Sequence, residues 1–355
     1  MRVAVLWSEL SGYLNACLKE LVQTGGAELF VAHVPPSQAA PFDVASFEWI
    51  GDRYLWEEGR GHDDFLPRLE RFGPDVILCV NWHHREYREA LKRFRGRAVR
   101  IFASDRPWTG TLRQWLGAAT SRFYLHPLCE AIFVPGERQV EFARRMGFKP
   151  EGILRGELSC DHGKFAEARR TRCAAPGEPR SFVYVGRFSA EKGIEALVRA
   201  YGEYRQASPD PWPLECYGAG PMAHLLDGVE GVEKKGFCQP DDLPGVLVEA
   251  GCLLLPSVRE AWGVAVHEAC AAGVPVIVSD AAGASVHLVQ DGYNGYVVEA
   301  GNAHALAQAM LRYAALSPPE RSGMGEAGYG LSLQFTPQRW ARTLLHRSAE
   351  MLGRP

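Results

Sequence analysis

Two glutamates and two cations lie in the second half of the chain, each shortly after an apolar run. Glu260 and Glu268 belong to the segment PSVREAWGVAVHEACAAGVPVIVSD, and Arg187 and Lys192 belong to VGRFSAEKG. Cations beside a helix N-terminus form an anion site, because the free N–H groups and the helix dipole both favour negative charge. A carboxylate can accept hydrogen bonds from both hydroxyls of a diol such as ribose. These residue types therefore indicate an anion site near a diol site.

Each of these residues also has an ordinary structural interpretation. Arg187 and Lys192 could be solvated side chains beside a helix that caps itself. Glu260 could be a helix N-terminal charge that contributes ~0.3–1 kcal/mol. Glu268 could be a solvated helix position. From chemistry alone both interpretations stay open.

A third segment, YGAGP at 217–221, follows another apolar run. It lacks the third glycine of the dinucleotide-binding pattern, because Ala223 and His224 stand there, so a dehydrogenase is disfavoured. Gly218 and Gly220 can still form a turn that a base or a phosphate approaches closely.

Short β-branched runs alternate with helical periodicity in both halves of the chain, which favours parallel sheets covered by helices. The strands that we predict are 2–7, 29–34, 75–80, 98–104, 131–134, 181–185, 214–217, 252–255, 276–279 and 296–298. The main predicted helices are 86–94, 192–205, 264–272 and 336–352. The fold class is therefore α/β with two doubly wound domains.

The domain boundaries follow from composition. The segment 165–180 is charged and then rich in small residues, proline and glycine, which predicts a linker between domains 1–164 and 181–335.

In open α/β sheets ligands bind beyond the carboxyl ends of the strands. The loops after the strands are therefore where we expect the site.

The motifs of the second half, taken together, resemble the retaining glycosyltransferases of family 4. The segments that carry the resemblance run in order through 181–313: VGRFSAEKG, YGAGP, GFCQPDDL, the stretch with the two glutamates seven residues apart, and DGYNGYVVEAGNAHALAQAM. The resemblance implies a GT-B fold, in which two Rossmann-like domains face each other across a cleft. It also implies that the C-terminal domain holds a nucleotide-sugar donor and that helix 336–352 crosses back to the N-terminal domain.

The resemblance further implies a role for individual residues. Arg187 and Lys192 would bind the donor diphosphate, Glu260 would contact hydroxyls of the transferred sugar, and Glu268 would hold the ribose. Further donor-binding positions are Gly186, Gly218, Gly220, Phe237, Trp262, Gly263 and Val264.

The N-terminal half matches the family less well. The loop after the first predicted strand carries the single glycine Gly12, where relatives often have a glycine-rich loop. Where many relatives have a histidine, this chain has Ser104 and Asp105. Asp105, or His83 after the neighbouring strand, could line the cleft on the acceptor side. The histidines lack the partners that would indicate a metal site.

Composition limits the remaining classes. A net charge of −3 disfavours non-specific nucleic-acid binding, and nine cysteines without a C-x-x-C pair favour buried thiols in a reducing cytoplasm. We find no signal peptide and no membrane-spanning run. The segment 85–100 holds seven Lys and Arg against two acids, with aromatic residues between them. It is either a solvated helix face or a peripheral contact with the inner membrane face.

The sequence therefore predicts a cytoplasmic, retaining, metal-independent hexosyltransferase of glycan biosynthesis. It would use a nucleotide-diphosphate sugar and a glycan, lipid-linked or small-molecule acceptor. The alternatives are a catalytically silent GT-B domain acting as a partner or scaffold, and a nucleotide-sugar epimerase-like enzyme. The sequence does not identify the nucleotide, the sugar or the acceptor, because a few variable contacts set specificity on a shared scaffold.

Overall fold

The computed structural model describes residues 1–36, 44–57, 62–81 and 83–354 of the chain. It divides into two compact units. We call Met1–Ser159 together with Pro337–Pro355 the N-terminal domain, and Cys160–Thr336 the C-terminal domain.

The N-terminal domain is built on a parallel sheet of seven strands in its described part, in the order β3-β2-β1-β4-β5-β6-β7. The strands are β1 (Arg2–Glu9), β2 (Glu28–Val34), β3 (Asp52–Leu55), β4 (Val76–Cys79), β5 (Val99–Ala103), β6 (Ala131–Val134) and β7 (Ile153–Arg155). Its helices are α1 (Gly12–Gln23), α2 (Phe65–Phe72), α3 (Arg85–Arg93), α4 (Leu112–Tyr124), α5 (Glu137–Arg145) and α13 (Pro337–Met351). The first six positions reproduce the Rossmann strand order.

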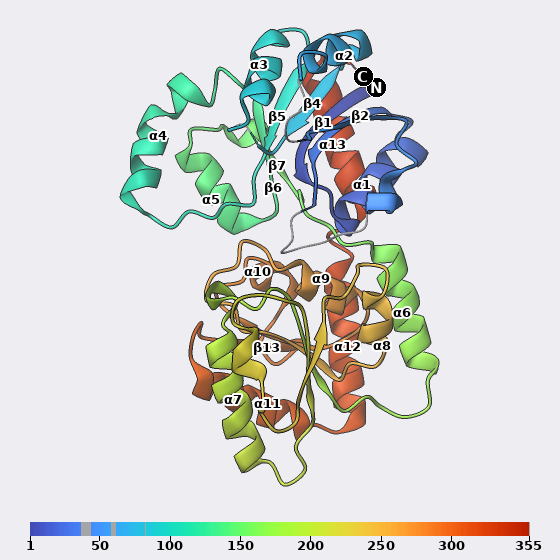
Figure 1. Ribbon diagram of the computed structural model, residues 1–355, viewed down its shortest axis with the longest axis vertical. Coiled ribbons are helices and arrows are strands. Elements are labelled where there is room, and N and C mark those ends of the chain that lie inside the picture. The colour runs from blue at the N-terminus through green and yellow to red at the C-terminus, as the bar shows by residue number, and fades with distance from the viewer. Residues whose placement is uncertain (37–43, 58–61, 82, 355) are drawn as a thin grey trace. The chain divides into compact units, whose positions relative to one another are not determined.

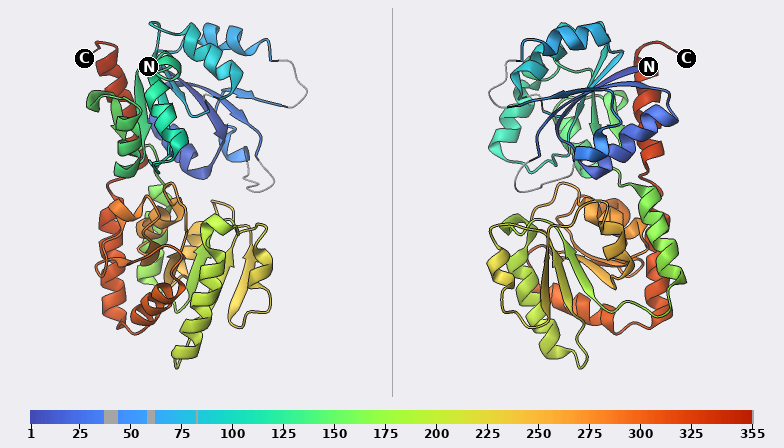
Figure 2. Two further views of the ribbon diagram at one scale, coloured as in Figure 1. Left: turned by 90° about the vertical axis from the view of Figure 1, so that its left-hand side faces the viewer. Right: turned by 45° about the vertical axis from the view of Figure 1, so that its right-hand side comes forward.

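The last helix of the chain completes the core of this first domain. Figure 1 shows α13, in red, beside α1, in blue. Trp340 and Leu344 of α13 are buried with residues of β1, β4 and β6. The Trp340 indole N–H also donates a 2.6 Å hydrogen bond to the carbonyl of Glu157, just after β7. Both ends of the chain therefore lie on the N-terminal domain (Figure 2), as the predicted crossing helix requires.

The C-terminal domain repeats this architecture with six parallel strands in the order β10-β9-β8-β11-β12-β13. The strands are β8 (Phe182–Val185), β9 (Leu214–Tyr217), β10 (Val232–Gly236), β11 (Cys252–Leu255), β12 (Val276–Ser279) and β13 (Gly295–Val298). The helices are α6 (His162–Ala174), α7 (Ile194–Ala207), α8 (Leu243–Val248), α9 (Val264–Ala271), α10 (Ser285–Leu288), α11 (Ala303–Ala314) and α12 (Pro318–Ser332). The predicted α/β class with two doubly wound parallel sheets is confirmed.

The ten strands that we predicted are all present, whereas β3, β7 and β10 were missed. β3 (DRYL) and β10 (VEKKG) contain no apolar run, and β7 has only three residues. All three are edge strands of their sheets. An edge strand pairs with one neighbour only and is less buried than a central strand, so it needs no continuous apolar run.

The segment 165–180 is structured differently from the predicted linker. Residues up to Ala174 belong to α6, which packs on α8 and α9 within the C-terminal domain. Phe165 and Ala168 of α6 are buried, three residues apart. Arg169 pairs with Glu326, and the Arg172 guanidinium donates to the carbonyls of Val248 and Ala250. Part of the charge that suggested a linker therefore binds α6 to its own domain.

Candidate functional site

The loop after β8 and the loop after β11 touch through their backbones. These strands are neighbours in the sheet, so both loops leave its carboxyl edge together. A Cβ atom on Gly193 would lie 2.1 Å from the carbonyl oxygen of Pro256, so only glycine fits there. The N–H groups of Val258 and Arg259 donate to the carbonyl of Glu191 at 2.9 and 3.0 Å. These contacts hold the backbones of the two loops together.

Lys192 and Glu260 form an ion pair across these loops. The Lys192 ammonium donates to the Glu260 carboxylate, and the Ser257 hydroxyl donates to the same oxygen at 3.2 Å. The side chains are 25% and 11% exposed, so water screens the pair only in part. The two residues, predicted to bind different parts of one ligand, are thus brought together and neutralise each other.

The helix starts differ slightly from the prediction. Lys192 ends a short 3-10 turn, η3 (Ala190–Lys192), and α7 begins two residues later. Glu260 precedes the first residue of α9, Val264, by four positions. The Arg187 side chain is exposed on the same loop as Lys192.

The predicted glycine turn lies directly against the loop after β8. A Cβ atom on Gly218 would lie 1.9 Å from the carbonyl oxygen of Gly186, and one on Gly220 would lie 2.4 Å from that of Phe188. The Phe188 N–H donates to the carbonyl of Ala219 at 2.8 Å. These backbone contacts alone explain why positions 218 and 220 are glycine, so the two glycines are not independent evidence for a bound ligand.

Glu268 is half-buried on α9, and burial raises the pKa of its carboxyl to about 7. In the described part of the chain no side chain forms a hydrogen bond or ion pair with this carboxyl. The segment after β10 lies close to Glu268. Burial first, and then the charges of Asp242 and Glu268, raise the pKa of the Cys238 thiol in that segment. Phe237, half-buried, is the neighbour of Cys238. Glu268 is therefore no solvated helix position.

Trp262 and Gly263 shape the turn into α9. The Trp262 side chain is buried and meets Phe335 edge to face at 5.1 Å between ring centroids. Gly263 has φ +100°. In this left-handed conformation a side chain would be strained, and the turn directs the backbone into the helix that starts at Val264.

A cavity of about 610 Å³ lies in the N-terminal domain, at the carboxyl edge of its sheet. Two of the three predicted acceptor-side residues, Asp105 and His83, line it. Gly12 does not, and is the first residue of α1. Asp105 does not cap the helix that follows it, because the Thr111 side chain caps α4. Burial, followed by Arg106 and Arg113, lowers the pKa of His83.

Glu157 lines the same cavity and escaped the sequence analysis. It is 5% exposed, and its Oε2 atom has no hydrogen-bonding partner among the described residues. Burial, reinforced by the charge of Asp105, raises the pKa of this carboxyl well above its ordinary value. The sequence offered one signal: the glutamate in ILRGEL comes two residues after the missed strand β7, where a cleft loop begins.

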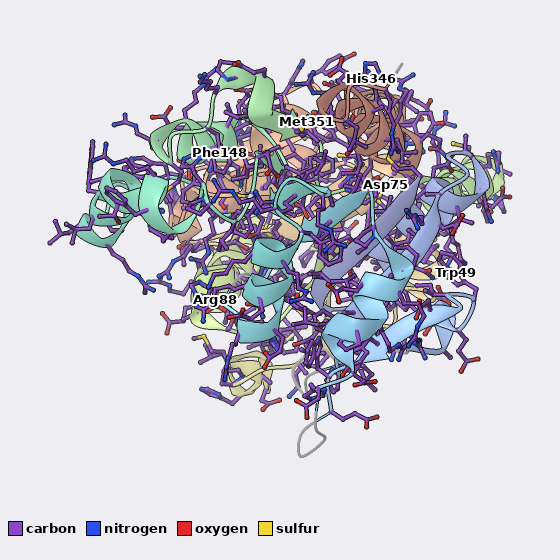
Figure 3. All side chains as sticks on the ribbon, turned by 90° about the horizontal axis from the view of Figure 1, so that it is seen from above. Trp49, Asp75, Arg88, Phe148, His346 and Met351 are labelled. Carbon is purple, nitrogen blue, oxygen red and sulfur yellow. The ribbon has the colours of Figure 1, made fainter. Side chains whose placement is uncertain are left out.

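The basic segment 85–100 has the character of a solvated helix face. Its aromatic residues Tyr87 and Phe94 are buried in the core, and Arg93 pairs with Glu70. Arg100 is buried and ion-paired with Glu130. Arg88 on α3 is half-buried (Figure 3).

Two kinds of site do not occur in the described part of the chain. No group of three or more His, Cys, Asp or Glu residues there could hold a metal ion. None of its helices is both long and apolar enough to cross a membrane.

The ion pair should couple Lys192 and Glu260 energetically. In a double-mutant cycle of Lys192→Met and Glu260→Gln, each single change leaves a partly buried charge unpaired, so we expect a coupling free energy of about 1–3 kcal/mol. Urea unfolding of the full chain measures it. The exposed pair Lys164–Asp241 is the matched control, whose coupling we expect to be below about 1 kcal/mol. Additive effects at Lys192 and Glu260 would contradict the pair.

Glu157 should make the stability of the N-terminal domain depend on pH. Because its pKa is raised, the folded domain holds the proton more tightly than the unfolded chain. Its contribution to stability is therefore lost as pH rises above the ordinary carboxyl range. We expect Glu157→Gln to melt at a higher temperature than the parent at pH 8, with the difference shrinking toward pH 4. Glu28→Gln, at an exposed glutamate of the same domain, should show no such trend. Parallel pH curves for parent and Glu157→Gln would refute this role.

Part of the C-terminal domain is similar in sequence to known proteins. Residues 179–315 match the family model "Glycosyl transferases group 1". The D-inositol 3-phosphate glycosyltransferase of Corynebacterium aurimucosum is 30% identical over 190 residues, which cover 50% of this chain and 44% of that protein. The matched segment thus spans less than half of that relative.

Solved structures share the fold over nearly the whole chain. A glycosyltransferase from Rickettsia africae is 14% identical, with a TM-score of 0.74 over 99% of this chain and 98% of that one. HepE of Anabaena, solved in complex with UDP and glucose, is 15% identical, with a TM-score of 0.70 over 99% of both chains. The chain therefore has the GT-B fold, and its segment 179–315 carries the sequence pattern of the group 1 glycosyl transferases.

Proposed function

We propose that this chain is a retaining glycosyltransferase that moves a hexose-type sugar from a nucleotide-diphosphate sugar to a hydroxyl of a glycan, lipid-linked or small-molecule acceptor. The observation that carries the proposal is the arrangement of Lys192 and Glu260 on neighbouring loops at the carboxyl edge of the C-terminal sheet, with Glu268 on the helix α9 that follows. This arrangement lies within the segment that matches the glycosyl transferases. Relatives of the same fold have been solved with UDP and with UDP-glucose, which supports a nucleotide-sugar donor.

In the proposed reaction the bond between the sugar and the diphosphate breaks while the leaving diphosphate gains charge. Arg187 and Lys192 supply positive charge to it, and fixed charges stabilise a developing charge without reorganising. We propose that this electrostatic work needs no metal ion. Lys192 must divide its charge between Glu260 and the phosphate, so donor binding would loosen the ion pair and free the carboxylate to accept sugar hydroxyls.

Glu268 is proposed to hold the ribose. A carboxyl that is partly buried without a partner gains most from ligand hydroxyls, because it has already lost part of its hydration. Gly186, Phe237 and the backbone from Trp262 to Val264 would frame the rest of the donor. In the N-terminal domain, the cavity with Asp105, His83 and Glu157 would receive the acceptor.

Donor affinity should rise with pH through the titration of Glu268. The ionised carboxyl accepts charge-assisted hydrogen bonds, which are roughly twice as strong as neutral ones. With a pKa of about 7, Glu268 becomes ionised between pH 6 and pH 8. We expect calorimetry with UDP-, GDP- and ADP-sugars to find one that binds, and to bind tighter at pH 8 than at pH 6. The diphosphate of such a donor does not titrate in this range.

The variants Glu268→Gln and Glu249→Gln test that assignment. Glu268→Gln should bind the same donor more weakly and with little dependence on pH, while Glu249→Gln, at an exposed glutamate of the same domain, should behave like the parent. Unchanged binding and pH dependence in Glu268→Gln would remove Glu268 from the site.

The two glutamates should separate in kinetics. Glu260 would act where charge develops, so Glu260→Gln should lower kcat by about 10²-fold or more. Glu268 would contact a part of the donor that does not react, so Glu268→Gln should mainly raise KM. Initial rates of donor hydrolysis and of sugar transfer measure both. If the parent protein binds a donor but neither hydrolyses nor transfers its sugar, the catalytically silent GT-B domain is favoured instead. If Glu260→Gln mainly raises KM and Glu268→Gln mainly lowers kcat, the two glutamates have exchanged roles.

A further inference from the structure

The cavity of the N-terminal domain is lined by two arginines that no acidic side chain of the described chain neutralises. Arg106 follows β5 by three residues, and Arg113 is the second residue of α4. Within the described residues, neither guanidinium forms a hydrogen bond or an ion pair with another side chain. By contrast, Arg100 of β5 itself is paired with Glu130. Two cations without a partner in the described chain therefore border one cavity.

The side chain of Gln114 holds the two arginines on one rim of this cavity. Its oxygen accepts hydrogen bonds from the N–H and the hydroxyl of Thr109 at 2.7 and 2.9 Å. Its nitrogen donates to the carbonyl of Pro107 at 2.9 Å. The loop 106–111 is thereby folded against the first turn of α4. The loop carries one arginine and the helix carries the other, so their backbones keep one spacing.

His83 marks the cationic side of the cavity. Burial first, and then the charges of Arg106, Arg113 and Arg88, lower the pKa of its imidazole. These three arginines come from three separate elements, because Arg88 belongs to α3. Guanidinium groups form paired, parallel hydrogen bonds with the oxygens of phosphate and carboxylate groups. This side of the cavity therefore fits an anionic group.

Glu157 marks a second, acidic side of the same cavity. Its side chain is 5% exposed, and its Oε2 atom has no hydrogen-bonding partner among the described residues. Burial first, and then the charge of Asp105, raise the pKa of this carboxyl, so its neutral form persists to a higher pH than usual. The charges of both carboxyls also help burial to raise the pKa of Tyr13, which places the three groups near one another. A neutral carboxyl both donates and accepts, which suits hydroxyl groups.

We propose that the acceptor received by this cavity carries an anionic group, phosphate or carboxylate, beside its hydroxyls. Arg106 and Arg113 bind the anionic group and determine specificity, while Glu157 and Asp105 bind hydroxyls on the other side. A neutral sugar would leave both arginines without a partner. Calling the ligand an acceptor rests on the proposed function, whereas the preference of the cavity for an anion does not.

The experiment compares neutral and anionic forms of the same small molecules by calorimetry with the full chain. Glucose is compared with glucose 6-phosphate and glucuronate, and glycerol with glycerol 3-phosphate and glycerophosphoglycerol. We expect at least one anionic form to bind about tenfold or more tightly than its neutral form, because charge-assisted hydrogen bonds are roughly twice as strong as neutral ones. Tighter binding of glycerophosphoglycerol than of glycerol 3-phosphate would identify a lipid headgroup, rather than a free phosphate, as the source of the anionic group.

Substitutions of exposed arginines assign the preference to the cavity. The double variant Arg106→Gln/Arg113→Gln should bind the neutral and anionic forms about equally, since it removes both charges and keeps polar side chains. Arg122→Gln is the matched control, because Arg122 is exposed on the same helix and does not line the cavity. It should keep the preference of the parent. Melting curves should confirm that every variant is folded.

Two outcomes would overturn the proposal. One is a parent that binds no anionic form, or binds both forms equally. The other is an anion preference that survives in the double variant. Calorimetry with nucleotide sugars tests the proposed function separately, because the proposed donor residues belong to the C-terminal domain. A chain that binds a nucleotide sugar without an anion preference keeps the proposed function and refutes this inference. A chain with the preference but without a donor keeps the anion-binding cavity and refutes the role of its ligand as an acceptor.

Discussion

An ion pair between two loops, Lys192 with Glu260, lies at the carboxyl edge of the C-terminal sheet. It exists because β8 and β11 are neighbours in the sheet and because Gly193 lets the backbone of one loop rest on Pro256 of the other. The charges are thereby placed by backbone contacts rather than by flexible side chains alone. The backbone contacts would hold the two loops in place even when donor binding loosens the ion pair, as the proposed reaction requires.

The other two carboxyls of interest differ from Glu260 in having no cation beside them. Burial has raised the pKa of both Glu157 and Glu268. The Oε2 atom of Glu157 is buried and has no hydrogen-bonding partner among the described residues. Such groups cost stability in the free protein. Proteins often keep such destabilising groups where a ligand would form hydrogen bonds with them, because the needs of function can oppose stability. Both carboxyls lie at the carboxyl edge of a sheet, where we propose that ligands bind.

Sequence reasoning succeeded where one property decided the outcome. Buried central strands such as β4 and β11 are plain apolar runs. The roles of Glu260 and Glu268 remain predictions. Sequence reasoning failed where a contact depended on residues that are far apart in the chain. The pairing of Lys192 with Glu260, 68 positions apart, follows from strand order. The membrane contact suggested by the basic segment 85–100 stays a prediction, and the aromatic residues Tyr87 and Phe94 of that segment belong to the core.

The packing of α13 has a consequence for how the molecule assembles itself. Trp340 and Leu344 belong to the core of the N-terminal domain but are translated after the whole C-terminal domain. While the ribosome is still making residues up to Thr336, the first sheet has an apolar groove beside α1 that no later residue has yet filled. Domains usually fold in the order of synthesis. In this chain the first domain to emerge is the last that can finish folding, so a ribosome that stalls late leaves its core open.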